Sequence, residues 1–233
     1  IRASYSGSLT RSLYVRGGTP TDGDAACGLN WQSGVKMTSL SSTSYVFELD
    51  CDESLEFKVL IGDSEWEKGM NHKFDGTSDV TVYPYFYSTT GATQVIRNVK
   101  SKELDNSRDV IVYMPPGYEE NTLMKVSNVL IMHDGQNLFN PLTAFLGNAW
   151  MIQDTLDPMI SAGAMESVLV VGPYNTGDSR CDEYTYSYDE GEACGGLGDL
   201  YLDFLESTVV PLALDTFQVT SNYSLGILGS SLG

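Results

Sequence analysis

The sequence predicts two folds in succession: a small all-β sandwich of the immunoglobulin type over residues 1–90, and an α/β domain with a mostly parallel sheet over residues 91–233. Three observations lead to this prediction. Short alternating runs fill the first part, longer apolar runs and helical stripes fill the second, and a Ser-Thr-Thr-Gly-Ala segment at 88–92 lies between them. Strands that alternate with helices are typical of a sheet covered on both faces.

Four short runs in the first part alternate apolar and polar residues, and turn residues separate them. Such alternation puts every second side chain on one face, which is the period of a half-buried strand. No apolar stripe with helical spacing occurs here, so two sheets packed face to face are the simplest way to bury these faces. The predicted strands are Ser12–Arg16, Ser44–Leu49, Leu55–Ile61 and Val80–Phe86.

The second part alternates predicted strands with predicted helices. Val126–Met132 is a nearly continuous apolar run, as expected for a strand buried on both faces. Pro211 should kink or break the second helix, because proline has no amide hydrogen to donate. The predicted strands are Arg108–Met114, Val126–Met132, Ser167–Val171 and Tyr223–Leu228, and the predicted helices are Ala149–Ser161 and Leu197–Phe217.

The charge is strongly negative. The 31 acidic residues outnumber the 13 basic ones, which gives a formal net charge of −18. A surface of this sign repels phosphate backbones and anionic lipid headgroups, so we expect neither nucleic acid nor a membrane surface as a partner. The charge serves solubility, or it repels or selects charged substrates. No apolar stretch reaches the ~18 residues of a transmembrane helix.

The four cysteines favour a secreted protein. None forms a Cys-x-x-Cys pair, and the sequence holds only two histidines, so we predict no metal site. Proximity in the sequence pairs Cys27 with Cys51 and Cys181 with Cys194, which gives one disulfide in each domain. The alternative is four free buried thiols, as expected in a reducing compartment.

The segment Gly229-x-Ser231-x-Gly233 is the strongest chemical signal. A serine nucleophile must stand clear of the sheet on a sharp strand-to-helix turn, and glycines flank it where the turn packs too closely for a Cβ atom. The amide of Leu232 could then donate to an oxyanion. The alternative is an ordinary Gly/Ser turn, but the apolar strand directly before the motif favours a nucleophile elbow.

A second motif, residues 133–137, follows the Val126–Met132 strand. Ligands gather at the carboxyl ends of parallel strands, and Gly135 lets backbone amides turn toward such a site. We predict that the Gln136 amide is the second oxyanion donor. His133 could act as a general base, but a histidine in this loop more often braces the site.

With both motifs placed, the second domain resembles the esterase D family of α/β-hydrolases. This resemblance implies an α/β-hydrolase fold, Ser231 as the nucleophile, and the Leu232 and Gln136 amides as oxyanion donors, with no metal or organic cofactor. It covers about residues 96–233. The matching residues are Arg108-Asp109-Val110, Pro115-Pro116-Gly117-Tyr118, Val129 to Phe139, Trp150, Val170-Val171-Gly172, Asn175, Arg180, Glu183-Tyr184, Gly198 to Leu205, Pro211 and Gly229 to Gly233.

The sequence departs from that family at its end. The family places its triad acid and its histidine after the nucleophile, whereas no residue follows Gly233 here. We therefore interpret the chain as a partial sequence, in which the α/β-hydrolase fold is incomplete and the triad acid and histidine lie outside it. Ser231 without a base would be an unactivated hydroxyl.

The first domain resembles starch-binding modules, in which two tryptophans and nearby polar residues line one glycan site. Aromatic faces stack on sugar rings, and polar side chains bind the hydroxyls. The residues that this resemblance implies are Trp31, Lys58, Trp66, Glu67 and Asn71. The alternative is that the two tryptophans are core or domain-packing residues.

Together these features predict a secreted serine carboxylic-ester hydrolase, with acylated polysaccharides among its candidate substrates. The alternative is a non-catalytic glycan-binding or structural protein of an extracellular assembly that reuses the hydrolase fold. Arg180, Glu183 and Tyr184 follow the third predicted strand of the second domain. They either touch substrate or tie their loop to the Cys181–Cys194 disulfide.

Overall fold

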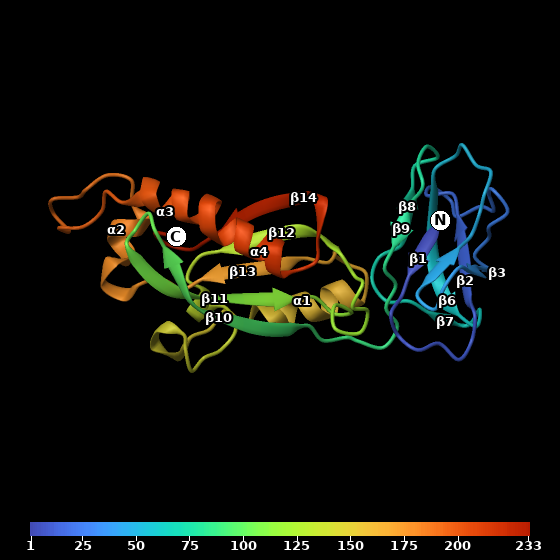
Figure 1. Cartoon of the computed structure of the whole chain (residues 1–233), viewed down its shortest axis with the longest axis horizontal. Helices are drawn as coiled ribbons and strands as arrows, with labels where there is room; N and C mark the ends of the chain where they lie inside the picture. Colours follow the sequence, from blue (N-terminus) through green and yellow to red (C-terminus); the bar gives the residue numbers. More distant parts are fainter. The chain divides into compact units, whose positions relative to one another are not determined.

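The computed structural model describes all 233 residues, which form two compact units. The first, here called the β unit, comprises Ile1–Gly91 together with the inserted segments Pro116–Lys125 and Asp157–Glu166. The second, here called the α/β unit, comprises Ala92–Pro115, Val126–Leu156 and Ser167–Gly233 (Figure 1). The chain therefore passes from one unit to the other several times.

The β unit contains two sheets. One has the strand order β4-β5-β1-β9, and the other has the order β3-β2-β6-β7, with β8 also pairing with β6. All pairings are antiparallel except that of β1 with β9. The strands are β1 (Arg2–Ser4), β2 (Leu13–Gly18), β3 (Val35–Lys36), β4 (Thr38–Ser39), β5 (Ser44–Val46), β6 (Leu55–Ile61), β7 (Glu65–Trp66), β8 (His72–Phe74) and β9 (Thr81–Val82).

Both sheets contribute apolar side chains to one core. Ala3 and Val82 come from the first sheet, and Val15 and Phe57 come from the second. The sheets therefore face each other, as the alternating runs predicted; the immunoglobulin type of this arrangement stays a prediction. The run Val80–Phe86 forms only the short β9, because Pro84 lacks the amide hydrogen that a strand needs.

Polar contacts hold the first inserted segment in the β unit. The Glu120 carboxylate accepts hydrogen bonds from the amides of residues 86–88, at 2.7, 2.9 and 2.7 Å. Asn121 is fully buried and donates to the carbonyls of Ser4 and Pro84, both at 2.9 Å. Buried polar groups need such partners, and every bond named here links residues far apart in sequence.

The α/β unit is built on a five-stranded sheet with the order β10-β11-β13-β12-β14 (Figure 1). The pairs β12–β13 and β12–β14 are parallel, whereas β10–β11 and β11–β13 are antiparallel. The sheet is therefore mixed rather than mostly parallel as predicted. The strands are β10 (Ala92–Ser101), β11 (Asn106–Met114), β12 (Val126–Met132), β13 (Leu169–Pro173) and β14 (Val219–Leu228).

Two antiparallel pairings account for this difference: that of β11 with β13, both of which were predicted, and that of β11 with β10, an edge strand that was not predicted. The strand β10 lies at the sheet edge, most of its residues are exposed or half-buried, and polar residues interrupt its apolar pattern. A strand that is exposed to solvent on both faces lacks the alternation of apolar and polar residues by which a strand is predicted. The ladder between β10 and β11 also shifts between Ile96 and Val99, where Asn98 has a φ of 55°.

The α/β unit also contains most of the helices. The stretch predicted as one helix, Leu197–Phe217, is a continuous run of α3, η4 and α4, and its buried side chains include Tyr201, Phe204 and Val209. Pro211 does not break it; the π-helical segment η4 directly precedes the turn that contains the proline. The helices are η1 (Gly135–Asn137), η2 (Phe145–Gly147), α1 (Ile152–Ser161), η3 (Gly177–Ser179), α2 (Arg180–Tyr184), α3 (Gly198–Phe204), η4 (Leu205–Val209) and α4 (Val210–Thr216).

Both predicted disulfides are present. Cys27 and Cys51 have Cα atoms 5.5 Å apart and pack at the margin of the β-unit core, and Cys181 and Cys194 have Cα atoms 5.8 Å apart. No cysteine is free. None of the helices combines the length and the apolar composition that crossing a bilayer requires.

Candidate active site

The turn after β14 presents Ser231 to solvent. Ser231 is exposed and has a φ of 59°, in the left-handed region that non-glycine residues rarely occupy. The Gly233 amide donates to the Ser230 carbonyl at 3.0 Å, which closes a tight turn around the serine. A strained backbone of this kind costs on the order of 1 kcal/mol or more and is characteristic of functional sites.

The two glycines that flank Ser231 are required by close packing. A Cβ atom added to Gly229 would lie 2.8 Å from His133 Cδ2 and would also collide with the Gly233 backbone. A Cβ atom on Gly233 would lie 3.0 Å from His133 Cβ and 3.1 Å from Tyr184 Cε2. The Gly-x-Ser-x-Gly pattern thus reflects the close approach of the turn to the loop after β12.

The loop after β12 begins at the same sheet edge as the serine turn. The strands β12 and β14 are parallel neighbours, with Met132 opposite Leu228. The His133 amide donates to the Leu228 carbonyl at 3.0 Å, so the loop after β12 and the serine turn leave the sheet at the same level. The two motifs that the sequence analysis singled out are therefore adjacent at the carboxyl ends of parallel strands, where ligands bind in sheets of this kind.

Gln136 lies in the 3₁₀ turn η1 of this loop. Its carbonyl accepts the Thr143 hydroxyl at 2.7 Å, and its side-chain Oε1 accepts the Asn175 amide at 3.2 Å. Both polar ends of the residue are thus fixed. The backbone amides of Gln136 and Leu232 meet no protein acceptor, so both are available to bind another group.

His133 packs against the serine turn and two tyrosines. Its Nδ1 shares a hydrogen bond of 2.9 Å with the Tyr201 hydroxyl, and its ring centroid lies 5.2 Å from that of Tyr184. Burial lowers the pKa of His133; nearby Asp134 opposes this effect and Arg180 reinforces it. These contacts with two tyrosines favour the bracing role over that of a general base.

Asp134 is a buried carboxylate at a left-handed position, with a φ of 58°. Arg180 binds it through two nitrogens, Nε to Oδ1 at 2.8 Å and Nη2 to Oδ2 at 2.7 Å, and Asn175 donates to Oδ1 at 2.7 Å. Burial by itself would raise the pKa of Asp134, but the bonds from Arg180 and Asn175 outweigh it and hold the pKa below its usual range.

A second ion pair is buried deeper in the unit. Arg108 of β11 donates to both carboxylate oxygens of Glu183 at 2.8 Å, and both side chains are 1% exposed. Asn106 donates to the same carboxylate at 2.9 Å, and the guanidinium lies 4.8 Å from the Phe204 ring centroid. Glu183 and Tyr184 therefore contact protein groups, which favours the loop-tying interpretation over direct contact with substrate.

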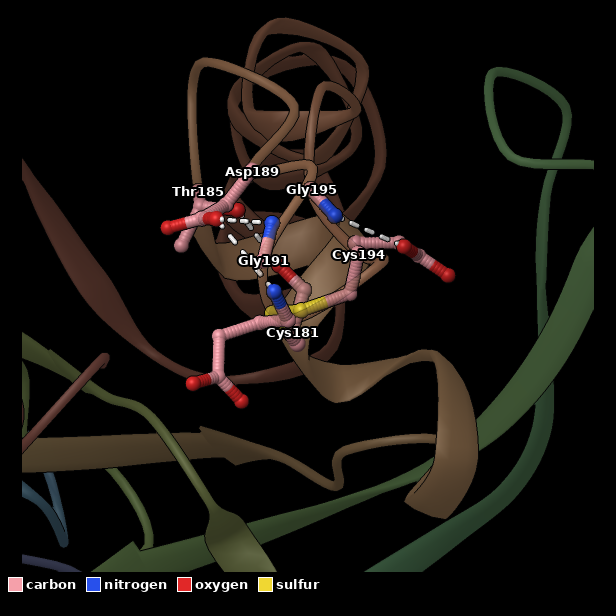
Figure 2. Close-up of a disulfide and its surroundings, with 8 residues drawn as sticks. Cys181, Thr185, Asp189, Gly191, Cys194 and Gly195 are labelled. Atoms are coloured by element: carbon pink, nitrogen blue, oxygen red, sulfur yellow. Dashed lines mark hydrogen bonds between the residues drawn. A yellow bond between two sulfur atoms is a disulfide. The ribbon is translucent and has the colours of Figure 1, made fainter.

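The helix α2 is also held by the Cys181–Cys194 disulfide (Figure 2). Figure 2 shows the surrounding loop folded back on itself through Asp189, whose Oδ1 accepts the Gly191 amide at 2.8 Å. The Gly195 amide donates to Asp182 Oδ1 of α2, also at 2.8 Å. The exposed acidic loop is thus fastened to α2 by one covalent link and by hydrogen bonds.

The predicted glycan residues of the β unit fall into two groups. Trp31 and Trp66 come together: their ring centroids are 6.2 Å apart at an interplanar angle of 30°, and Trp66 is 40% exposed. The Arg16 guanidinium lies 5.3 Å from the Trp66 ring centroid and also binds Asp63. The two tryptophans thus share one surface of the sheet that contains β2, β6 and β7.

The three polar residues predicted to bind glycan, Lys58, Glu67 and Asn71, form hydrogen bonds with other groups of the protein. Lys58 Nζ donates to the carbonyls of Glu67 and Gly69, at 3.1 and 2.7 Å. Glu67 is 3% exposed and accepts the Val59 amide, and Asn71 donates to a glutamate of β6 at 3.0 Å. The sequence pattern could not reveal these pairings, because each partner is eight or more residues away.

Several solved structures are similar to about three fifths of the chain. An IroE-like serine hydrolase from Shewanella oneidensis is 22% identical, with a TM-score of 0.47, over 61% of this chain and 43% of that one. A ferulic acid esterase is 21% identical with a TM-score of 0.44, over 62% and 52% of the two chains. The siderophore hydrolase EstA from Aspergillus nidulans is 21% identical with a TM-score of 0.42, over 60% and 50%. The chain thus spans about half the length of these proteins.

No curated protein matches the chain. A family model does: residues 101–233, more than half of the chain, match the family described as "Putative esterase". The match includes the loop after β12 and the turn that holds Ser231. The starch-binding resemblance of the β unit has no such support and stays a prediction. The chain belongs to this esterase family.

Proposed function

We propose that the full-length protein is a serine carboxylic-ester hydrolase in which Ser231 is the nucleophile. One observation carries this proposal: the exposed serine, strained at a φ of 59°, lies on a turn that packs directly against the loop after β12. The amides of Leu232 and Gln136 have no protein acceptor, and they belong to these two segments. They are suited to hold the oxyanion that forms when a hydroxyl attacks an ester carbonyl.

The reaction then follows the acyl-enzyme route. The Ser231 oxygen attacks the carbonyl carbon while its proton passes to a histidine base, and the tetrahedral oxyanion collapses with release of the alcohol. Water hydrolyses the acyl-enzyme by the same steps. We do not assign the base to His133, whose Nδ1 is engaged with Tyr201 and whose ring packs against Tyr184. In hydrolases with this turn, the acid and the histidine follow the serine in the chain.

The test is a kinetic comparison on the full-length protein with aryl acetate and feruloyl esters. We expect Ser231→Ala to lower kcat/KM by on the order of 10⁴-fold or more, because the nucleophile is lost. Ser230→Ala is the matched control: it removes a neighbouring hydroxyl from the same turn and should leave kcat/KM within a few-fold. Hydrolysis that survived Ser231→Ala at the wild-type rate would overturn the proposal.

A second function, glycan binding by the β unit, rests on the Trp31–Trp66 pair. Two stacked rings inclined at 30° to each other, one of them 40% exposed, form a surface on which a sugar ring can stack. We propose an acylated polysaccharide as the substrate that would link the two functions, and an extracellular setting, which the two disulfides favour. Lys58 and Glu67 contribute by supporting β6 and β7 rather than by contacting sugar.

Glycan arrays probed with the wild-type protein and its variants test this second function. Trp66→Ala should abolish binding to any glycan retained by the wild type, and Trp31→Ala should weaken it. Trp150→Ala is the control, since Trp150 is similarly exposed, at 44%, but belongs to the α/β unit. Binding that is unchanged in both Trp31→Ala and Trp66→Ala would reject the tryptophan pair as a glycan site.

A further inference from the structure

Arg180 contacts both segments of the candidate active site. Its guanidinium holds the Asp134 carboxylate through two bonds of 2.8 and 2.7 Å, and Nη2 also donates to the Ser230 carbonyl at 3.4 Å. Asp134 lies two residues before Gln136, and Ser230 directly precedes Ser231. One rigid, planar cation therefore links the loop that carries one candidate oxyanion donor to the turn that carries the candidate nucleophile.

The Asp134 carboxylate ties this conformation to the site. A left-handed φ of 58° is uncommon outside glycine, although Asp adopts it more readily than most residues, and it directs the chain into the η1 turn that contains Gln136. Arg180 and Asn175 together occupy both oxygens of the Asp134 carboxylate, and the Asn175 amide in turn holds the Gln136 side chain. The position of the Gln136 amide thus depends on the group that Arg180 binds.

The helix that carries Arg180 is anchored to the rest of the α/β unit. Arg180 begins α2, whose Cys181 is bonded to Cys194 and whose Glu183 forms the buried pair with Arg108. Its guanidinium also lies 4.9 Å from the ring centroid of Tyr184 in the same helix. A short helix that is anchored by a disulfide and a buried ion pair can hold a side chain in one orientation, which a free loop could not do.

We propose that Arg180 is a positioning residue that sets the distance between the Gln136 amide and the Ser231 hydroxyl. It acts through Asp134 and the Ser230 carbonyl and does not itself touch the reacting atoms. This inference rests on the proposed function. An oxyanion donor works only when it lies at hydrogen-bond distance from the oxygen formed in the transition state, so a displaced loop reduces turnover more than substrate binding.

The experiment uses the full-length protein and a neutral aryl acetate. Active sites are first counted with a fluorophosphonate, so that kcat refers to folded, reactive molecules only. We expect Arg180→Gln to lower kcat per titrated site by roughly 10- to 100-fold, with KM within about twofold of wild type. Arg180→Lys should recover part of this loss, because lysine supplies the charge but not the two-pronged geometry.

A boronic acid gives a readout that a purely structural role would not change. Its tetrahedral adduct places an oxygen at the oxyanion position, so its inhibition constant should rise in Arg180→Gln by about the same factor as kcat falls. The double variant Arg180→Gln, Asp134→Asn should be no slower than the worse single variant, since both act through one contact. Arg97→Gln is the matched control: Arg97 pairs with Asp109, but its side chain is 73% exposed.

The outcomes separate this inference from the proposed function. An inactive wild-type protein, or an active Ser231→Ala variant, would overturn both. If the wild type is active and Ser231→Ala is not, then a kcat per titrated site in Arg180→Gln within twofold of wild type would overturn the positioning role alone. A loss confined to KM would also overturn it and would identify Arg180 as a substrate-binding residue.

Discussion

The two candidate sites use their polar residues in opposite ways. In the α/β unit, the ion pairs and hydrogen bonds of Asp134 and Glu183 hold the backbone in place, so that two amides stay available. In the β unit, Lys58 donates to the Glu67 carbonyl, and the Glu67 carboxylate accepts the Val59 amide. These polar groups are therefore used within the protein, and the aromatic faces of Trp31 and Trp66 are left for a ligand. A site of backbone amides needs a polar scaffold, whereas a stacking surface needs little more than two exposed rings.

Disturbing the backbone of the serine turn should have the greatest effect on activity. Gly229→Ala places a Cβ atom 2.8 Å from His133 and against the Gly233 backbone, so the turn must move. We expect kcat/KM for an aryl ester to fall at least ~100-fold while the protein stays folded. Gly226→Ala, in the preceding strand, meets only the flexible end of Leu130, at 3.2 Å, and serves as the control. Equal activities of the two variants would contradict the packing argument.

Breaking the buried ion pair of the α/β unit should destabilise the protein more than breaking the partly exposed Arg16–Asp63 pair of the β unit. Glu183→Gln leaves the Arg108 guanidinium buried without a counter-charge, and we expect it to lower the free energy of unfolding by about 3 kcal/mol or more. Asp63→Asn, which removes the partner of Arg16, should lower it much less, because the Asp63 side chain is 30% exposed and water screens the lost charge. Urea unfolding of both variants measures the difference; similar costs would be inconsistent with the burial seen here.

The two disulfides allow a comparison with a smaller expected difference. They join residues separated by 24 and 13 positions, so chain entropy predicts that Cys27–Cys51 contributes about 3.5 kcal/mol and Cys181–Cys194 about 3 kcal/mol. Paired cysteine-to-alanine variants, unfolded in urea, give the two values. We also expect the loss of Cys181–Cys194, and not of Cys27–Cys51, to lower esterase activity, since only the former anchors the helix that begins at Arg180. Equal loss of activity in both variants would count against that anchoring role.

The smallest expected effect concerns pH. Burial lowers the pKa of His133 in the folded protein, so the unfolded chain binds more protons between that pKa and the unfolded value of about 6.5. The contribution of His133 to stability is therefore fully present above about pH 6.5 and is lost as the pH falls through the folded pKa. Asp134, whose folded pKa is also lowered, adds acid sensitivity only below about pH 4. A His133→Gln variant should flatten the stability–pH curve between pH 5 and 7; an unchanged slope would contradict this assignment.

Much of the fold could be predicted from local patterns. The strands Leu55–Ile61 and Val126–Met132 have the predicted bounds, because alternation in the first and a mostly apolar run of strand length in the second both favour a strand. The edge strand β10 could not be predicted, since its two wet faces leave no such pattern. The mixed character of the sheet was missed partly for the same reason, and partly because no local pattern gives the relative direction of β11 and β13.

Some features of the candidate site could likewise be predicted from local patterns, and others could not. The Gly-x-Ser-x-Gly turn and the loop at 133–137 follow apolar strands, so their adjacency could be inferred from strand order and backbone chemistry. The Arg180–Asp134 and Arg108–Glu183 pairs join residues 46 and 75 positions apart, and no local pattern links them. Buried charge requires a partner, but the sequence alone does not say which one.

Labelling with a fluorophosphonate tests whether Ser231 is the nucleophile. The reagent is incubated with the full-length protein, and the modified peptide is identified by mass spectrometry. An exposed, activated Ser231 predicts a single adduct on the peptide that contains residues 229–233, which is absent in Ser231→Ala and retained in Ser230→Ala. An adduct on another serine, or labelling that persists in Ser231→Ala, would contradict the assignment of Ser231 as the nucleophile.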